Sequence, residues 1–379
     1  MGEITLFLFL VLFFYPYVIY PGLLFFSVRL RRRTEVAAGE PETYPSAAMV
    51  ICALNEEKVI DQKLENCLKL EYPGQKLRII VVSDGSTDRT ATVVRSYIPS
   101  GIEMIEQERR RGKIANLNEV IPQLNEDIVI LSDANVMYQA DAVKRLAARF
   151  QDPSVGCVSG KVILTDSATE LDATTGQYYT VEWLLQEASS MIYSMAGADG
   201  AMYAMRRDLF RPCPSDTIVE DFVIPMGIVR QGKRVVHESE AVGWERGPAT
   251  MREEFRRKVR IAAGVAQGLV RGNAWPPLTA PLRFWFVFLS HKLLRWISPF
   301  FGLAILCCAF LTIHERGAQI VLGGIAVLLM LGLGQLLTKW GNPVVGAPLY
   351  FLMGQVALGW GLLKGLLGQQ TVLWVKENR

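Results

Sequence analysis

Three apolar, β-branched runs in the first third of the chain each end in side chains that carry amides or carboxylates. Runs of this kind, alternating with helical patterns, predict parallel strands joined by helices. Open α/β sheets bind ligands at the carboxyl ends of their strands, so these side chains are placed to contact a ligand. They are Asn55 and Glu56 after the first run, Asp84 after the second, and Asp133 and Asn135 after the last.

The first two strand ends could hold a nucleoside. Asp84 can accept hydrogen bonds from a base or a ribose, although an acid beside Gly85 is equally typical of an ordinary turn. Two interpretations fit the end of the first strand. Either Asn55 caps a helix that begins at Glu56, or Glu56 contacts the base of the ligand.

A basic run and a short acidic motif could hold a diphosphate and a cation. Arg109 to Lys113 is interrupted by Gly112 just before a predicted helix, 113–124. Such a run is usually a solvated face, but cations at a helix N-terminus also suit a diphosphate. Asp133 and Asn135 could ligate Mg²⁺ or Mn²⁺, which proteins hold with one or two carboxylates plus phosphate oxygens.

Acids later in the chain could serve an acceptor. Glu220 and Asp221 begin a predicted helix, 219–230, where a carboxylate could take a proton from an attacking hydroxyl. The alternative is a pair of N-terminal acids stabilised by the helix dipole. The small residues around Asp199, namely Gly197 and Gly200, allow close approach of an acceptor, or form a plain turn.

A basic helix, 251–271, precedes the C-terminal apolar region. Arg257 and Arg260 lie one turn apart and therefore share a face. Together they could reach a diphosphate, or they could meet lipid headgroups.

The composition points to a membrane. The chain has 379 residues, half of them hydrophobic, and its net charge of +3 is too small to indicate a nucleic-acid partner. The mean hydropathy of +0.22 is high for a soluble protein. Six cysteines without CxxC spacing favour a reducing compartment over a disulfide framework.

Four apolar segments are long enough to predict membrane spans. Basic residues from Arg29 to Arg33 follow the first, which by the positive-inside rule places the main domain in the cytoplasm and the protein in the cell membrane as a multi-pass protein. An even number of spans would place both termini outside. A mixed apolar and basic stretch, 281–295, predicts an interfacial amphipathic helix. The four segments are 4–28, 296–312, 318–337 and 344–363.

These patterns predict an α/β fold with a mostly parallel, Rossmann-like sheet flanked by transmembrane helices. The predicted parts are an N-terminal transmembrane helix with its basic flank (1–33), a linker (34–45), the catalytic domain (46–275), the interfacial helix (276–296), and C-terminal transmembrane helices with a tail (297–379).

The order of these motifs resembles the membrane-bound family-2 glycosyltransferases with a GT-A domain, such as poly-N-acetylglucosamine, hyaluronan and cellulose synthases. The resemblance covers roughly residues 46–275. It implies that Asn55, Glu56 and Asp84 would contact the nucleoside and that Lys113 would lie near the diphosphate. Asp133 would carry the metal, Arg260 would bind phosphate, and Asp221 would be the general base.

The sequence departs from the family pattern at two places. The metal motif Asp-x-Asp ends here in Asn135, which offers a neutral oxygen. The Gln-x-x-Arg-Trp motif of processive members corresponds to 257–261, where Arg260 is retained and Ile261 replaces the tryptophan.

The resemblance implies an inverting enzyme that moves a sugar from a nucleotide-sugar, a UDP-sugar first, to a hydroxyl of a polysaccharide chain or a lipid near the bilayer. Mg²⁺ or Mn²⁺ would be its cofactor. The departures leave single transfer and polymer synthesis both open. An alternative is a catalytically silent membrane subunit that binds nucleotide-sugars within a polysaccharide assembly.

Overall fold

The computed structural model describes residues 2–31, 41–73, 76–165, 172–248, 250–338 and 343–371. An eight-stranded sheet lies at its centre, in the order β3-β2-β1-β4-β7-β6-β8-β5. The strands are β1 (Ala47–Ala53), β2 (Leu77–Asp84), β3 (Ile102–Gln107), β4 (Ile128–Asp133), β5 (Met137–Tyr138), β6 (Val155–Thr165), β7 (Met202–Arg206) and β8 (Arg234–Arg246).

The first half of the sheet is parallel, as the sequence predicts. β1 pairs in parallel with β2 and β4, and β2 with β3. The second half is mixed, because β7 runs antiparallel to both β4 and β6 while β6 and β8 are parallel. The polar ends of β1, β2 and β4 therefore share one edge of the sheet.

Alternation along the strands divides the core into two layers. Met49 and Ile51 of β1 face one apolar cluster, which includes Leu64 of α3. Val50 faces the other, which includes Leu117 of α5. The helices that cover the parallel half are α3 (Ile60–Leu68), α4 (Thr90–Ser96), α5 (Lys113–Val120) and α6 (Ala142–Ala148), followed by short 3₁₀ turns at 98–100, 121–123 and 149–151.

Three further helices join the sheet to the apolar region: α7 (Asp172–Ile192), α8 (Glu220–Arg230) and α9 (Met251–Val270). A capping box between Thr250 and Glu253 fixes the start of α9. α13 (Pro343–Leu366) packs against α9 at Gly361 and Gly365. A Cβ at Gly361 would lie 2.4 Å from the Val259 carbonyl oxygen, so only glycine permits this approach.

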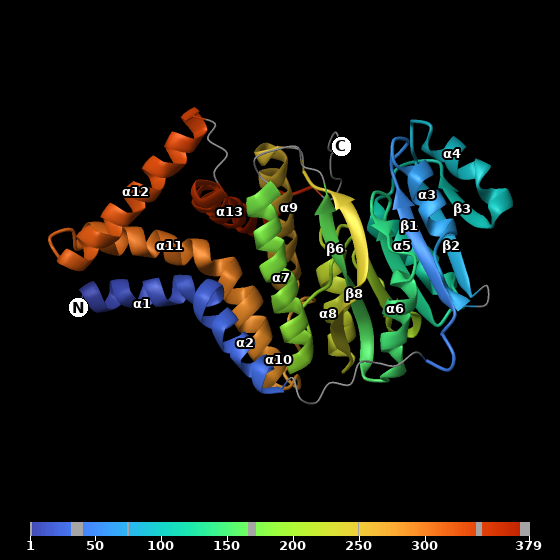
Figure 1. Ribbon diagram of the computed structural model, residues 1–379, viewed down its shortest axis with the longest axis horizontal. Coiled ribbons are helices and arrows are strands. Elements are labelled where there is room, and N and C mark those ends of the chain that lie inside the picture. The colour runs from blue at the N-terminus through green and yellow to red at the C-terminus, as the bar shows by residue number, and fades with distance from the viewer. Residues whose placement is uncertain are drawn as a thin grey trace.

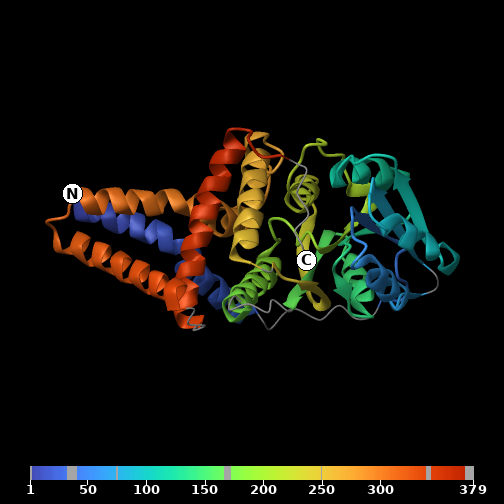
Figure 2. The same cartoon turned by 90° about the horizontal axis from the view of Figure 1, so that it is seen from above.

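The apolar helices extend away from the sheet (Figures 1 and 2). α1 (Gly2–Phe14), a π-helical turn at 15–19 and α2 (Tyr20–Arg31) follow one another without a break and form a continuous N-terminal helical rod. α10 (Leu282–Val287), a π-turn at 288–293 and α11 (Leu294–Leu311) form the next, and α12 spans Arg316–Thr338. α1 lies beside α11.

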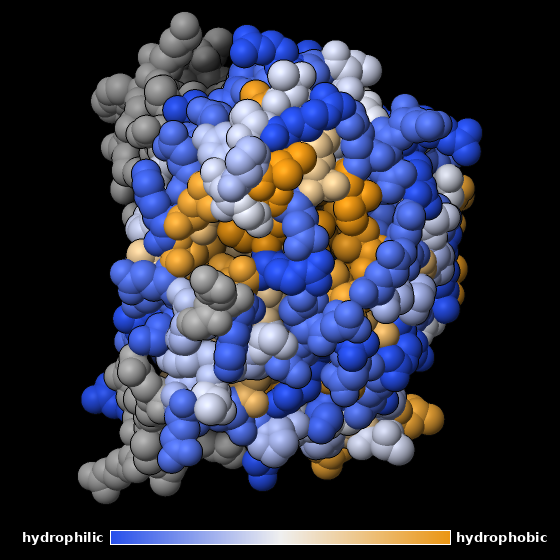
Figure 3. All heavy atoms as spheres, turned by 90° about the vertical axis from the view of Figure 1, so that its right-hand side faces the viewer, coloured by the Kyte–Doolittle hydropathy of each residue, from blue (hydrophilic) through white to orange (hydrophobic). Residues whose placement is uncertain are grey.

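Among the described residues, three helices are long and apolar enough to cross a membrane: 2–29, 282–311 and 348–366. A shorter apolar helix covers 316–332. Exposed side chains such as Phe7, Phe310 and Ile320 line these helices, which suits contact with lipid. By contrast, the opposite end of the molecule is mostly hydrophilic around one apolar area (Figure 3).

The helical structure differs from the sequence prediction at 281–312. A separate interfacial helix ending at Arg295 was expected, but the helix continues through a π-turn into α11, so one rod covers 282–311. Apolar residues on both sides of the basic stretch keep the rod long enough to span. Arg32, Arg33, most of the predicted linker (34–40) and the tail (372–379) lie outside the described residues.

Candidate active site

The side chain of Asp84, at the end of β2, is hydrogen-bonded to the basic loop 109–113. Its carboxylate accepts hydrogen bonds from the backbone N–H groups of Arg111 (2.7 Å) and Gly112 (2.9 Å). Gly85 has φ +68°, and a Cβ there would lie 2.5 Å from the backbone nitrogen of Arg110. Glycine therefore lets the loop close over the strand end, and Asp84 fixes the entry to α5.

Asn55 ties the end of β1 to the turn after β2. It has the left-handed φ of 55° that asparagine tolerates. Its Oδ1 accepts from the backbone N–H of Thr87 (2.7 Å), and its own N–H donates to Ser86 Oγ (3.1 Å). The predicted helix start at Glu56 is wrong, because α3 begins at Ile60. The side chain of Asn55 instead bonds the neighbouring turn.

Lys113 joins the end of β4 to the start of α8. Its Nζ lies 2.8 Å from Asp133 Oδ1 at the end of β4 and 2.6 Å from Glu220 Oε1 at the start of α8. Burial disfavours the charged lysine, but the two carboxylates outweigh it and raise the pKa of Lys113 well above its usual value. A single cation thus holds together acids from distant parts of the chain.

Asp221 lies beside the predicted acceptor loop. The backbone carbonyl of Asp221 accepts from the Ala198 N–H (2.9 Å), and a Cβ on Gly200 would lie 2.6 Å from Asp221 Oδ2. Gly197, with φ +100°, packs against Phe222. Burial, with the adjacent Glu220, raises the pKa of Asp221 to about 7. A carboxylate tuned to that range can exchange a proton near neutral pH.

Asp199 completes the acceptor loop. Its backbone N–H donates to Ser159 Oγ (2.9 Å), and its Oδ1 accepts from the Ala201 N–H (3.1 Å). Burial raises the pKa of Asp199 to about 6, and the charges of Glu245 and Asp133 act in the same direction. The loop therefore lies within electrostatic reach of the end of β4.

The residues around Asp133 offer oxygen ligands, which suit Mg²⁺ or Mn²⁺. The Asn135 amide is bonded through its Nδ2 to Glu245 Oε1 (3.0 Å). Among the described residues, no three His, Cys, Asp or Glu side chains form a complete metal cage. A donor set this sparse fits an ion that takes further ligands from phosphate oxygens.

Arg260 and Arg257 extend from α9 toward this edge. Arg260 donates to the Ile218 carbonyl (3.3 Å), and its charge favours ionisation of Asp221. Arg257 donates to the Tyr179 hydroxyl (2.9 Å). Ile261, at the position of the tryptophan in the Gln-x-x-Arg-Trp pattern, is 39% exposed. Tyr179 thus contacts the basic helix.

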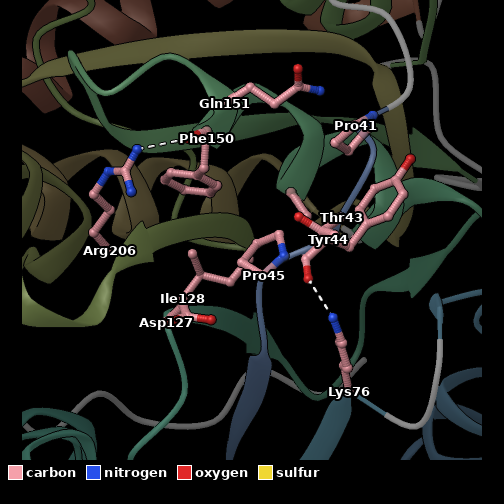
Figure 4. Close-up of a pocket in the computed structure, with 11 residues that line it drawn as sticks. Pro41, Thr43, Tyr44, Pro45, Lys76, Asp127, Ile128, Phe150, Gln151 and Arg206 are labelled. Atoms are coloured by element: carbon pink, nitrogen blue, oxygen red, sulfur yellow. Dashed lines mark hydrogen bonds between the residues drawn. The ribbon is translucent and has the colours of Figure 1, made fainter.

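A pocket at the opposite edge of the sheet contains none of these acids (Figure 4). Its lining includes Pro45 and Ile128, at the starts of β1 and β4, and Arg206, at the end of antiparallel β7. Lys76 Nζ donates there to the Tyr44 carbonyl (3.1 Å). Parallel sheets bind substrates at the other edge, so this pocket is separate from the candidate active site.

Sequence inspection missed Glu245, Ser159 and the partners of Glu182. Glu245 ends a long strand without any motif around it, and only the pairing of β8 with β5 and β6 brings it to the site. Glu182 lies on α7 and pairs with Arg295 (2.6 Å) of α11. Neither pairing leaves a local signal, because the partners are far apart in the chain.

Residues 48–212 match the family model "Glycosyl transferase family 2". The parallel sheet with acids at its carboxyl edge agrees with that match. The chain contains a family-2 glycosyltransferase domain with a GT-A fold, the catalytic unit of an enzyme that uses a nucleotide-sugar, and its long apolar helices are of the membrane-crossing kind.

Two individual proteins have sequences similar to this chain. The chain is 24% identical to poly-beta-1,6-N-acetyl-D-glucosamine synthase of Staphylococcus epidermidis, over 70% of this chain and 67% of that protein. It is 28% identical to the probable glycosyltransferase YdaM of Bacillus subtilis, over 58% of this chain and 55% of that protein. The match therefore spans little more than half the length of the second relative.

One solved structure shares the fold over nearly the whole chain. It is the mannosyltransferase PcManGT from Pyrobaculum calidifontis in complex with GDP-Man and Mn²⁺. The TM-score is 0.75 with 22% sequence identity, covering 98% of this chain and 100% of that one. The likeness includes the apolar helices as well as the sheet, which supports treating them as one architecture.

Proposed function

We propose that this enzyme transfers a sugar, with inversion, from a UDP-sugar to a hydroxyl group of an acceptor at the membrane. The acceptor would be a growing polysaccharide or a lipid, in exopolysaccharide or glycolipid synthesis. The observation that carries the proposal is Lys113, which bridges Asp133 on the donor side and Glu220, next to Asp221, on the acceptor side. Donor and acceptor groups so joined suit a direct transfer.

In the proposed reaction, Asp221 takes the proton of the acceptor hydroxyl as its oxygen attacks the anomeric carbon of the sugar. The bond from that carbon to the phosphate oxygen breaks, and the nucleoside diphosphate leaves with the electron pair. Lys113 and Arg260 offset the charge that develops on the diphosphate. Because the oxygen attacks the face of the anomeric carbon opposite to the departing diphosphate, the configuration at that carbon is inverted.

Asp133 and Asn135 would hold Mg²⁺ or Mn²⁺, with Glu245 beside them. When bound, the ion supplies Lewis-acid neutralisation of the leaving diphosphate. Asn55, Glu56 and Asp84 would hold the nucleoside, and Gly197, Asp199 and Gly200 would line the acceptor. We further propose that the catalytic domain faces the cytoplasm, where nucleotide-sugars are made.

Product analysis tests the proposal. Purified protein is incubated with Mn²⁺ and radiolabelled UDP-N-acetylglucosamine, other UDP-sugars or GDP-mannose, together with membrane lipids, and the products are sized. Long labelled chains would support polymer synthesis, and a single lipid-soluble product would support a lipid acceptor. Transfer from GDP-mannose alone would overturn the UDP assignment. Nucleotide binding without transfer from any donor would favour the silent subunit.

A further inference from the structure

The metal motif lacks its second acid, and the structure places a carboxylate from elsewhere beside that position. Asn135 stands where the family pattern has aspartate, and its Nδ2 donates to Glu245 Oε1 at 3.0 Å. The two residues are far apart in the chain. Because asparagine in place of aspartate at position 135 removes one negative charge, the neighbouring Glu245 restores the local number of carboxylates.

This hydrogen bond fixes which end of the amide faces Glu245. An ionised carboxylate only accepts hydrogen bonds, so the NH₂ group of Asn135 must be the group turned toward it. The opposite orientation of the amide would set two acceptor oxygens against each other. The planar amide then turns its oxygen away from Glu245, leaving that oxygen as the atom presented for a cation.

The strand pairing explains why Glu245 is held there. Trp244 of β8 pairs with Met137 of β5, and Glu245 pairs with Leu164 of β6. β5 begins two residues after Asn135, so the Trp244 pairing brings the next side chain of β8 to the amide. Glu245 is only 7% exposed. A carboxylate so buried costs free energy unless a polar partner compensates it.

We infer that Glu245 is a positioning residue for the divalent cation: it orients the Asn135 oxygen as a ligand and replaces the charge of the missing second aspartate. The inference rests on the proposed function, which supplies the cation. Outer-shell partners of this kind typically change metal affinity about 10–100-fold when mutated.

A reciprocal exchange separates this role from mere packing. Glu245→Gln keeps the shape and removes the charge. Asn135→Asp sets a carboxylate against Glu245 and removes the hydrogen bond. In the double variant, Asn135→Asp with Glu245→Gln, the glutamine donates and the aspartate accepts, so one bond and the net charge both return.

The experiment measures Mn²⁺ binding by electron paramagnetic resonance of the free ion, with full-length protein in detergent and saturating UDP, repeated with GDP. We expect Glu245→Gln to weaken Mn²⁺ binding about tenfold or more. We expect Asn135→Asp alone to bring no gain in affinity, and the double variant to return within about threefold of wild type. Glu238→Gln is the matched control, because Glu238 is a buried acid of the same strand that pairs with Arg149 instead.

The inference would be overturned by unchanged Mn²⁺ affinity in Glu245→Gln, by a large gain in Asn135→Asp alone, or by no recovery in the double variant. Thermal melting without metal reports folding, and if Glu245→Gln fails to fold, the double variant decides. Absence of Mn²⁺ binding by wild type would also overturn it. Sugar transfer plays no part in this readout, so the proposed function can fail while the role of Glu245 stands.

Discussion

Two ion clusters of this protein have opposite arrangements of charge. In the site, one cation, Lys113, lies between two acids, Asp133 and Glu220. In the second cluster, one acid, Glu182 of α7, lies 2.6 Å from Arg295 and 3.2 Å from His291 Nε2. Both clusters join segments that are distant in the chain.

The clusters differ in their access to solvent. The Asp133 side chain opens the first cluster to solvent, being 40% exposed at the edge of the sheet, whereas Glu220 (12% exposed) and Glu182 (14% exposed) are both enclosed. Burial opposes the charge of Glu182, but the facing cations outweigh it and hold the pKa of Glu182 well below its usual value. An open cluster can exchange partners with a ligand, while an enclosed one fastens the sheet domain to the apolar helices. Substitutions in the two clusters test that distinction.

The largest loss is expected from Asp221→Asn, which removes the proposed base and keeps the shape of the side chain. A positioned base contributes about 10²–10⁴-fold, so kcat should fall by that range. Single-turnover transfer measures it, with Asp208→Asn, an exposed acid, as control. Turnover within tenfold of wild type would exclude Asp221 as the base.

Lys113→Met should lower kcat by about 10²–10³-fold, because it removes a fixed cation from the developing charge on the diphosphate. It should also weaken UDP binding, measured by calorimetry. Lys69→Met serves as the control, since Lys69 forms only an exposed ion pair with Glu65. If UDP affinity and kcat both persist, the open cluster has no part in the chemistry.

Glu182→Gln should act on stability and leave the chemistry nearly intact. Breaking a buried pair leaves an uncompensated charge and costs about 3–5 kcal/mol of unfolding free energy. Thermal denaturation in detergent tests this against Glu187→Gln on the same helix. A loss of kcat without a loss of stability would contradict the structural role that we assign to this cluster.

The smallest effect is the pH dependence near neutrality. The base acts only when ionised, so kcat/KM should rise with pH, about tenfold per unit below pH 7, and level off above the Asp221 pKa of about 7. Because the charge of Glu220 helps to raise that pKa, Glu220→Gln should move the midpoint to lower pH. A midpoint that stays or moves upward would assign the titration to another group.

Much of the fold could be predicted from local patterns. The polar ends of β1, β2 and β4 follow apolar runs, and helical crossovers between strands produce parallel pairing with those ends on one edge. The predicted helices at 219–230 and 251–271 correspond closely to α8 and α9. Of the two interpretations of the first strand end, the helix start at Glu56 was wrong, because α3 begins at Ile60 and Asn55 bonds Thr87 in the turn after β2, a contact that no local pattern shows.

The sequence by itself determined the types of group available and the edge at which the first of them lie, since side-chain alternation and apolar runs are local properties. Only the tertiary structure decided their partners. Lys113 meets Glu220, Asn135 meets Glu245, and Glu182 meets Arg295. Each pair closes a long loop of chain, and the free energy of such a contact depends on burial and strand register, which exist only once the sheet has formed.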